Sequence, residues 1–315
     1  MRIVVVDHVY LEDQHIQQLR SIGELQVFPD PPTSNEELKQ RIQGADIVIV
    51  GWSNMTREVI DSSRNLKMIS LWATTCHYAD LEAAKERGVV VTHVPGYAAE
   101  AVAEHAFALL LASSRKLLLA DKHVREGKFD WRPFRGMELA GKTLGIIGAG
   151  AIGFRVAEIA KAFKMKILAF DIKPDMKKAD QVGMAYVDLE RLLRESDIVS
   201  VHVTLTSETK RLIGKSEIDA MKDGAVIINT AQGGVIDEKA LVDALKSGKL
   251  SYAGLDVLED EPPAKDNPLF KLDNTVLCPH VGFHTVEAVK RCTDICIDNV
   301  AKFVEGRLQN TCEFS

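Results

Sequence analysis

The sequence predicts an α/β protein of two domains, each built on a doubly wound parallel sheet. Short β-branched runs alternate with helical patterns over residues 2–92, and the same alternation starts again at residue 143. Such alternation is typical of βαβ units, whose strands lie parallel. A glycine-rich motif at residues 148–153 lies in the middle of the chain, so residues 1 to about 96 are expected to form a domain of their own.

Short runs rich in β-branched residues are predicted to be the strands of the first domain, and they lie at residues 2–7, 25–28, 46–50, 66–71 and 88–93. Helical patterns separate them, for example at residues 35–42 and 80–88. A long apolar-periodic segment, residues 98–126, is predicted to be one helix that crosses into the second domain.

A second series of apolar runs predicts strands at residues 143–148, 166–171, 185–188, 197–203, 225–230, 252–257 and 274–280. The last segment, residues 285–306, is expected to be a helix that returns to the first domain. Its expected packing positions are Val286, Val289, Ile295, Ile297, Val300 and Phe303.

The composition is that of a globular protein. A length of 315 residues is sufficient for about two domains, and a mean hydropathy of -0.03 is not that of a membrane protein. The net charge of -6 gives no electrostatic reason to expect nucleic acid or a membrane surface as a partner. The N-terminal apolar run is too short for a signal peptide or a membrane span, so a cytoplasmic location is expected.

The cysteines are predicted to be reduced thiols. There are five, an odd number spread through the chain: Cys76, Cys278, Cys292, Cys296 and Cys312. Cys292 and Cys296 lie four residues apart on a predicted helix, but no histidine at zinc-ligand spacing accompanies them. No metal site is therefore expected.

The glycine-rich motif predicts a dinucleotide site, because a strand leads into Gly148, Gly150 and Gly153 and a helix follows. The first glycine allows a tight turn, the second lets the backbone approach a pyrophosphate, and the third allows the helix to pack closely on the strand. The helix N-terminus, with Ala151 and Ile152 in its first turn, supplies N–H groups and a positive dipole end.

Asp171 ends the next predicted strand. A carboxylate at this place accepts hydrogen bonds from the adenosine ribose hydroxyls and repels a 2′-phosphate. NAD is therefore the expected cofactor. Lys173 is close enough to soften this preference, but it is expected to be a solvated surface lysine.

Several ordered motifs closely resemble the D-isomer-specific 2-hydroxyacid dehydrogenases, a family that includes phosphoglycerate, glycerate, formate and phosphite dehydrogenases. They are "VAEHAFALLL", "TLGIIGAGAIG", "SDIVSVHVTLTSETKRLI", "NTAQGGVID", "AGLDVLEDEP" and "CPHVGFHT". The resemblance covers nearly the whole chain. It implies a Rossmann NAD domain at residues 97–285 and a smaller flavodoxin-like substrate domain at residues 1–96, completed by residues 286–315.

The resemblance assigns the proton-transfer pair to His280 and Glu261. In the family, a histidine in a Pro-His motif is the acid/base, and the glutamate of a preceding Glu-Pro motif orients it. Reduction of a keto group needs a proton as the hydride arrives, and an imidazole titrates near neutral pH. His202 and His284 are weaker candidates for this role.

The sequence departs from the family in the third catalytic residue, because Gln232 occupies the place of an arginine that grips the substrate's carboxylate and carbonyl. Glutamine offers one NH₂ group and no charge, whereas guanidinium is a charged planar fork. Thr75 stands where a glycine is usual in the carboxylate-binding stretch, and Thr204 replaces a proline. Since the cofactor motif and the His280–Glu261 pair are kept, an altered substrate is expected.

Further positions are implied by the family one residue at a time. The cofactor site is expected to include Val102, Thr204, Thr209, Thr230, Ala231, Asp256 and Gly282. Substrate contacts are expected at Trp52, Thr74, Thr75, Gln232 and Phe283.

The leading hypothesis is an NAD-dependent oxidoreductase that transfers a hydride to or from a small 2-hydroxy acid, a 2-keto acid or a related atypical substrate. Either Arg132 or Arg135 replaces the missing cation, or the substrate is less anionic. The alternative is a non-enzymatic NAD(H)-responsive regulatory protein, as corepressors of the family illustrate. A homodimer is expected, because the 98–126 segment and the loop with Trp131 and Phe134 are rich in apolar side chains.

Overall fold

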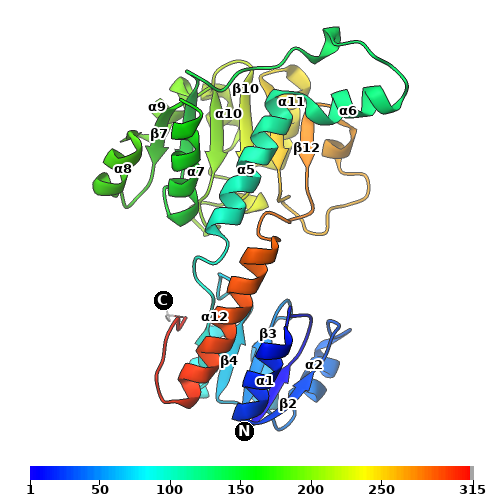
Figure 1. The fold of residues 1–315 in the computed structure, drawn as a ribbon, viewed down its shortest axis with the longest axis vertical. Helices are drawn as coiled ribbons and strands as arrows, with labels where there is room; N and C mark the ends of the chain where they lie inside the picture. The colour runs from blue at the N-terminus through cyan, green and yellow to red at the C-terminus, as the bar shows by residue number, and fades with distance from the viewer. Residues whose placement is uncertain (313–315) are drawn as a thin grey trace. The chain divides into compact units, whose positions relative to one another are not determined.

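The computed structural model describes residues 1–312, which fall into two compact units (Figure 1). One unit comprises Met1–Ala98 and the segment from Thr285 onward, and the other comprises Ala99–His284. Both are α/β units built on an all-parallel sheet, as the sequence predicts. Among residues 1–312, no helix is both long enough and apolar enough to cross a membrane.

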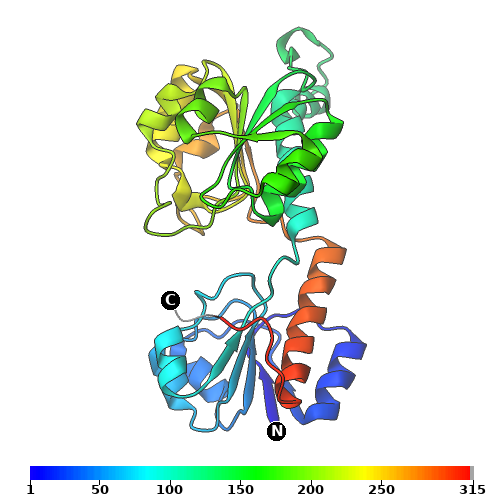
Figure 2. The ribbon, with the colours of Figure 1, turned by 90° about the vertical axis from the view of Figure 1, so that its left-hand side faces the viewer.

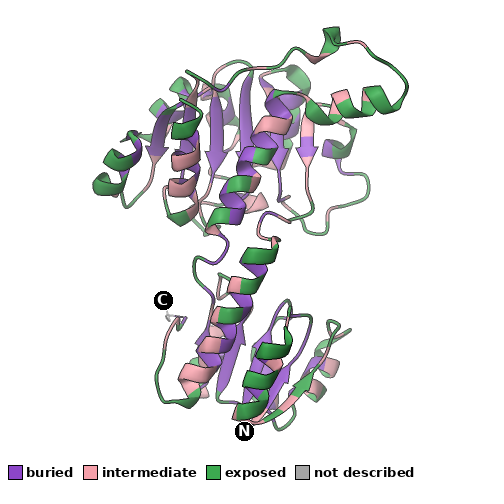
Figure 3. Cartoon of the chain, viewed as in Figure 1, coloured by how far each residue is buried: buried purple, intermediate pink, exposed green. Residues whose placement is uncertain are grey.

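The first unit has a five-stranded sheet in the order β2-β1-β3-β4-β5. Its strands are β1 (Arg2–Val5), β2 (Glu24–Val27), β3 (Ile47–Val50), β4 (Met68–Leu71) and β5 (Val90–Thr92). Every residue of β3 and β4 is buried, because helices cover both faces of a parallel sheet. Figure 3 shows these buried strands between more exposed helices.

Helices on one face of this sheet are α1 (Asp13–Ile22) and α12 (Val286–Val304), and those on the other are α2 (Asn35–Arg41), α3 (Arg57–Ser62) and α4 (Leu81–Glu86), as Figure 2 shows. One expected packing position of α12 is wrong, because Val286 is 84% exposed. It is the first residue of the helix, and Figure 1 shows this end of α12 extending past the strands of its own unit.

The second unit has a seven-stranded sheet in the order β12-β11-β10-β9-β6-β7-β8. Its strands are β6 (Thr143–Ile147), β7 (Lys166–Phe170), β8 (Met184–Tyr186), β9 (Ile198–Val201), β10 (Ala225–Asn229), β11 (Leu250–Leu255) and β12 (Thr275–Leu277). The central strands β9 and β10 are buried throughout.

Two apolar cores lie on the two faces of this sheet. One contains residues of α5 (Ala99–Ser114), α7 (Ala151–Ala162) and α8 (Met176–Val182). The other contains residues of α9 (Leu189–Glu195), α10 (Lys215–Ala220) and α11 (Glu238–Ser247). The sheet therefore has helices on both faces, which is the doubly wound arrangement.

The single helix predicted over residues 98–126 is in fact two helices, α5 and α6 (Leu117–Arg125). Lys116 separates them with a left-handed backbone conformation, φ 52°. An α-helix requires negative φ at every residue, so it cannot continue through this position.

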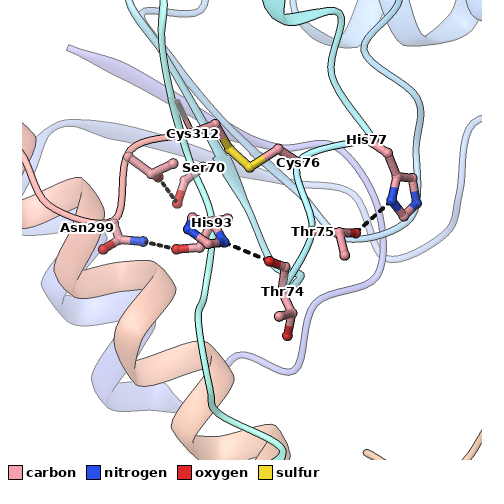
Figure 4. Close-up of a disulfide and its surroundings, with 9 residues drawn as sticks. Ser70, Thr74, Thr75, Cys76, His77, His93, Asn299 and Cys312 are labelled. Carbon is pink, nitrogen blue, oxygen red and sulfur yellow. Dashed lines mark hydrogen bonds between the residues drawn. A yellow bond between two sulfur atoms is a disulfide. The ribbon is translucent and has the colours of Figure 1, made fainter. Parts of the chain in front are cut away.

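The prediction that all five cysteines are reduced is wrong for two of them, because Cys76 and Cys312 form a disulfide (Figure 4). They are 236 residues apart in the sequence. The C-terminal segment approaches the edge strand β5, where the N–H of Cys312 donates to the carbonyl of Val91 (2.9 Å). This long-range pairing brings the two sulfurs together, whereas Cys278, Cys292 and Cys296 are free thiols.

Candidate active site

The carboxyl edge of the seven-stranded sheet contains a topological switch point. Strand β6 lies between β9 and β7, so the chain leaves β6 toward one side of the sheet and later returns to its other side. Ligands of open α/β sheets bind outside the carboxyl ends of the strands at such a point. Because all seven strands are parallel, the loops that follow β6, β9, β10, β11 and β12 leave from this one edge.

The glycines between β6 and α7 have three different surroundings. Gly148 has φ 92°, and a Cβ there would lie 2.8 Å from the carbonyl carbon and oxygen of His202. A Cβ at Gly153 would overlap the carbonyl oxygen of Gly148, so this glycine lets the helix pack against the loop. A Cβ at Gly150 would meet no described protein atom within 4 Å, which leaves the backbone there open to a ligand.

The N-terminus of α7 is also open to a ligand. The helix begins directly after Gly150, and no side chain caps it. The N–H groups of its first turn, which contains Ala151 and Ile152, therefore have no side-chain acceptor. A pyrophosphate is the kind of group that such N–H groups and the helix dipole bind. The residues present thus fit the dinucleotide that the motif predicts.

Asp171 follows β7 and is fixed beside the glycine loop. One carboxylate oxygen accepts the N–H of Ala149 (2.7 Å), and the other accepts the N–H of Lys173 (2.8 Å). Because Asp171 is only partly buried, the remaining lone pairs of its oxygens are available to hydroxyl donors. This geometry is compatible with a ribose contact.

Asp256, which follows β11, holds the loop that carries His280. Its carboxylate is 2% exposed and accepts the N–H groups of Val281 (2.9 Å) and Gly282 (2.8 Å), while its carbonyl accepts the N–H of His280 (2.8 Å). A Cβ at Gly282 would lie 2.8 Å from this carboxylate, which is why a glycine is needed there. Asp256 therefore fixes the position of the loop that carries His280.

The charge of Asp256 is stabilised in the interior. Burial by itself would raise the pKa of the Asp256 carboxyl, but the nearby His105 and the N–H groups of Val281 and Gly282 together lower it. His105 Nε2 lies 3.2 Å from the carboxylate, although not at a hydrogen-bonding angle. The carboxylate thus remains charged and bound at neutral pH.

His280 and Glu261 form the predicted pair. Nδ1 of His280 donates to Oε2 of Glu261 at 2.7 Å, and the second oxygen of Glu261 accepts the N–H of Leu258 at 3.2 Å. His280 has φ 54°, a conformation that is uncommon for a residue other than glycine and is maintained here by the bond to Asp256.

Each member of this pair changes the pKa of the other. The hydrogen bond and the charge of Glu261 raise the pKa of the His280 imidazole, although burial opposes them. Burial would raise the pKa of the Glu261 carboxyl, but the hydrogen bond and charge of His280 lower it. An imidazole that keeps its proton toward higher pH, with Nε2 directed away from its carboxylate, can serve as a proton donor.

Gln232 lies in a loop that is held by backbone contacts. Asn229 accepts the N–H of Ala231 (3.0 Å) and donates to the carbonyl of Gln232 (3.0 Å). The next residue, Gly233, touches the backbone of Leu258, where no Cβ would fit. The Gln232 loop and the loop that leads to Glu261 are therefore in direct contact, whereas the Gln232 side-chain amide makes no hydrogen bond to any described residue.

The other expected cofactor residues in this unit differ in their roles. Thr230 is buried, and its hydroxyl has no hydrogen-bond partner among residues 1–312. The hydroxyl of Thr209 donates to the carbonyl of Thr204 (2.6 Å) and stabilises the loop after β9. Val102 is buried in α5, and Ala231 is half-buried.

Two further rings lie at this edge. The ring of Phe283 is 6.3 Å from that of His280 in an edge-to-face arrangement. His202 lies against the glycine loop with Nε2 2.8 Å from the hydroxyl of Ser200, and burial lowers its pKa to about 3. His202 is therefore a neutral, structural histidine.

Arg132 and Arg135 do not reach Gln232 within one chain. They belong to the loop that enters β6 at its amino end, and this loop is bound to the end of α5 by the N–H of Met137, which donates to Ser114 (2.9 Å). Gln232 follows β10 at the opposite, carboxyl edge. Neither arginine therefore supplies a cation at Gln232 within this unit.

In the first unit, a buried aspartate fixes one of the predicted substrate loops. Asp7, just after β1, accepts the N–H groups of Gly51 (2.6 Å), Trp52 (2.9 Å) and Ser53 (2.7 Å). The ring of Trp52 is 45% exposed and lies 6.3 Å from the ring of Trp72. The backbone around Trp52 is thus rigid, while its indole remains accessible.

The loop after β4 contains Thr74 and Thr75. The carbonyl of Thr74 accepts a hydrogen bond from Nδ1 of His93 (2.6 Å), and the hydroxyl of Thr75 lies 2.7 Å from Nδ1 of His77. The expected substrate residues of this unit therefore lie on two loops at the carboxyl edge of its sheet.

Three residues that shape these loops were not singled out from the sequence: Asp7, His105 and Asn229. Asp7, Asn229 and Asp256 share a signal, because each is a short polar residue at the end of a buried strand. A side chain of this kind can bond the N–H groups of the loop that follows. His105 gave no such signal, since it lies inside a helical apolar pattern.

The family model described as "D-isomer specific 2-hydroxyacid dehydrogenase, NAD binding domain" matches residues 107–282. The chain belongs to this family. The matched segment lies within the second unit and includes the glycine loop, Asp171, Glu261 and His280. This dehydrogenase domain is therefore the part of the chain that binds the nicotinamide dinucleotide.

Similar proteins of this family cover nearly the whole chain. It is 38% identical to the glyoxylate reductase of Korarchaeum cryptofilum over 95% of its length and 92% of that protein. It is 40% identical to the D-3-phosphoglycerate dehydrogenase of Archaeoglobus fulgidus over 97% of its length, but spans only 58% of that relative. The solved structure "Acyclic imino acid reductase (Bsp5) in complex with NADPH and D-Arg" is similar with a TM-score of 0.91 at 36% identity, covering 99% of this chain and 100% of that one.

Proposed function

We propose that the protein is an NAD-dependent oxidoreductase that transfers a hydride between the nicotinamide and a small 2-hydroxy acid or 2-keto acid, or a related atypical substrate. The observation that carries the proposal is the His280–Glu261 pair, which joins a proton donor to an orienting carboxylate at the same edge of the sheet as the dinucleotide loop. Membership of the dehydrogenase family supports it.

When bound, the nicotinamide supplies or accepts the hydride. His280 provides the proton at the substrate oxygen during reduction and removes it during oxidation. Glu261 holds Nδ1, so Nε2 is the nitrogen that faces the substrate. Asp256 fixes the backbone of residues 280–282 and thereby the place of the imidazole.

The choice of NAD rather than NADP rests on Asp171. Its carboxylate is held beside the glycine loop by the N–H of Ala149, where a ribose hydroxyl can donate to it but a 2′-phosphate would be repelled. Lys173 donates its backbone N–H to the same carboxylate. The residue itself is exposed, as expected for a surface lysine.

The uncharged side chain of Gln232 favours a substrate with less negative charge at its reacting end. The two arginines that were candidates to replace the expected guanidinium lie at the other edge of the sheet, so neither of them supplies a cation at Gln232. In the first unit, Trp52, Thr74 and Thr75 are the proposed substrate contacts, and the exposed Trp52 favours an apolar or aromatic group. One structural relative is described as an imino acid reductase, so imines belong in the substrate screen.

The test is NADH oxidation against a panel of 2-keto acids, aldehydes, phosphonates and 2-imino acids formed from keto acids and amines. Turnover of at least one compound is expected, and His280→Ala should reduce it by about 10²- to 10⁴-fold. His284→Ala, which changes a histidine of the same motif, is the matched control and should retain most of the activity. Failure of every compound would favour the regulatory alternative.

We also propose that the protein is a homodimer. Large apolar side chains of α6 and the following loop are exposed, and they are Leu117, Leu118, Val124, Phe129 and Trp131, the last two at 95% and 82%. So many exposed large apolar side chains within one segment of the chain favour a protein interface there. Sedimentation should give a dimer at micromolar concentration, and Trp131→Glu should shift it toward monomer. A monomeric wild type would contradict this proposal.

A further inference from the structure

The disulfide joins the end of the chain to a loop for which substrate contacts are proposed. Cys76 directly follows Thr74 and Thr75 in the loop between β4 and α4, while Cys312 lies in the C-terminal segment (Figure 4). The disulfide therefore links the C-terminal segment covalently to the loop that contains Thr74 and Thr75.

The ends of this loop are fixed by backbone hydrogen bonds. The carbonyl of Ala73 accepts the N–H of Val94 (2.8 Å), and the carbonyl of Tyr78 accepts the N–H of Met55 (2.7 Å). These bonds join the two ends of the loop to residues outside it. The positions of Ala73 and Tyr78 therefore do not depend on the disulfide.

The middle of the loop, residues 74–77, depends on fewer links to the rest of its unit. The carbonyl of Thr74 accepts a hydrogen bond from the ring of His93, and the disulfide holds Cys76. The contact between Thr75 and His77 is internal to the loop. Cys76 also packs against the core of its unit. The disulfide is thus the one covalent anchor among the few links that hold residues 74–77.

The C-terminal segment is in turn linked to the same loop through His93. The N–H of His93 donates to the carbonyl of Asn310 (2.9 Å), while its ring donates to Thr74. One further backbone bond, from Cys312 to Val91, holds the segment against β5. Asn299 of α12 also holds His93 and Asn310. Release of Cys312 would therefore loosen mainly the last residues of the segment and the part of the loop next to Cys76.

We propose that the Cys76–Cys312 disulfide is a redox-sensitive tether that orders the 72–80 loop for substrate binding. A dithiol reductant attacks the sulfur of Cys76, a residue that is only partly buried, the S–S bond breaks, and two electrons and two protons pass to the cysteines. The products are two protein thiols and the oxidised, disulfide form of the reductant. The effect on substrate rests on the function proposed above, whereas the effect on loop order does not.

Reduction should weaken substrate binding and leave the cofactor site unchanged. The substrate would then have to order the loop on binding, and ordering one or two residues corresponds to a rise in KM of roughly 5- to 30-fold. NADH affinity should be unaffected, because the dinucleotide residues belong to the other unit. The value of kcat should change much less than KM.

The test compares full-length protein under oxidising conditions and after dithiothreitol. Hydrogen–deuterium exchange should increase in peptides covering residues 72–80 and 305–312 on reduction, and KM should rise. Cys312→Ser and Cys76→Ser should show the reduced behaviour in both conditions. Cys292→Ala, which removes a free thiol buried in α12, should keep the redox response.

Two results would overturn the proposal: five titratable thiols in the oxidised protein, or equal exchange of these peptides in both conditions. An increase in exchange with unchanged KM would also overturn it, because the loop would then not govern substrate binding. If no compound is turned over, the proposed function fails, and the exchange measurement alone decides whether the tether exists.

Discussion

Asp256→Asn tests whether a buried carboxylate holds the loop that carries His280. The wild-type carboxylate accepts the N–H groups of Val281 and Gly282 and is 2% exposed. Asparagine keeps one acceptor oxygen, so one of the two N–H groups would face an NH₂ group instead. Loss of one bond to a charged acceptor and a buried unpaired donor should lower the free energy of unfolding by about 2–4 kcal/mol.

The same substitution should reduce activity. The carbonyl of Asp256 accepts the N–H of His280, so a shift of this strand end moves the imidazole. A displacement of about 1 Å can cost about 10²-fold in rate, and a loss of kcat/KM of that order is expected.

The predicted loss of stability is measured by denaturant unfolding and by hydrogen exchange of a peptide covering residues 279–283. Asp223→Asn, whose side chain is 92% exposed, is the control and should change the free energy of unfolding by less than about 0.5 kcal/mol. An Asp256→Asn protein as stable as the control, with unchanged exchange, would refute the reasoning.

The contribution of Asp256 to the free energy of unfolding should also depend on pH, in a direction that its pKa determines. The folded-state pKa of Asp256 lies below its ordinary value, since His105 and the two N–H groups outweigh the burial that would raise it. Its stabilisation is complete above the unfolded pKa of about 3.9 and is lost as the pH falls through the lower folded value. The stability difference between wild type and Asp256→Asn should therefore narrow in acid.

Three further predictions concern the cofactor and substrate. Glu261→Gln should lower the pKa of His280, so the alkaline limb of the keto-reduction pH profile should move to lower pH; an unchanged profile would contradict the orienting role. Asp171→Ala should narrow the difference in affinity between NADH and NADPH, and equal affinities in the wild type would exclude an NAD preference. Gln232→Arg should lose activity on the true substrate while gaining on glyoxylate or hydroxypyruvate, whose carboxylate can pair with the new cation. A large gain on every substrate tested would instead mean that the wild-type site is impaired.

The glycine loop shows why part of the site could be predicted. Gly148, Gly150 and Gly153 lie within one strand–turn–helix unit, so the conformations they need are set by neighbours close in the sequence. The structure gives these glycines the separate roles predicted, with a turn at the first, an open backbone at the second and close packing at the third.

Other features depended on segments that are distant in the sequence. Asp256 was expected to lie near the nicotinamide, and the structure shows its carboxylate bound to the amides of residues 281 and 282. The break at Lys116 was not visible in an apolar pattern that continues from α5 into α6. The position of Asp256 at a strand end was a local signal, but the amides that its carboxylate binds lie 25 and 26 residues further along the chain.

The sequence by itself determined the two α/β units, the dinucleotide loop and the candidate pair His280 and Glu261, because strand runs, glycine spacing and family motifs are all local signals. Only the tertiary structure decided that Cys76 bonds Cys312, that Asp7 and Asp256 hold loops, and that Arg132 and Arg135 lie at the edge of the sheet opposite to Gln232. The physical reason is that each of these contacts joins residues far apart in the chain. Their proximity exists only after the parallel strands have paired and set which ends of the strands share an edge.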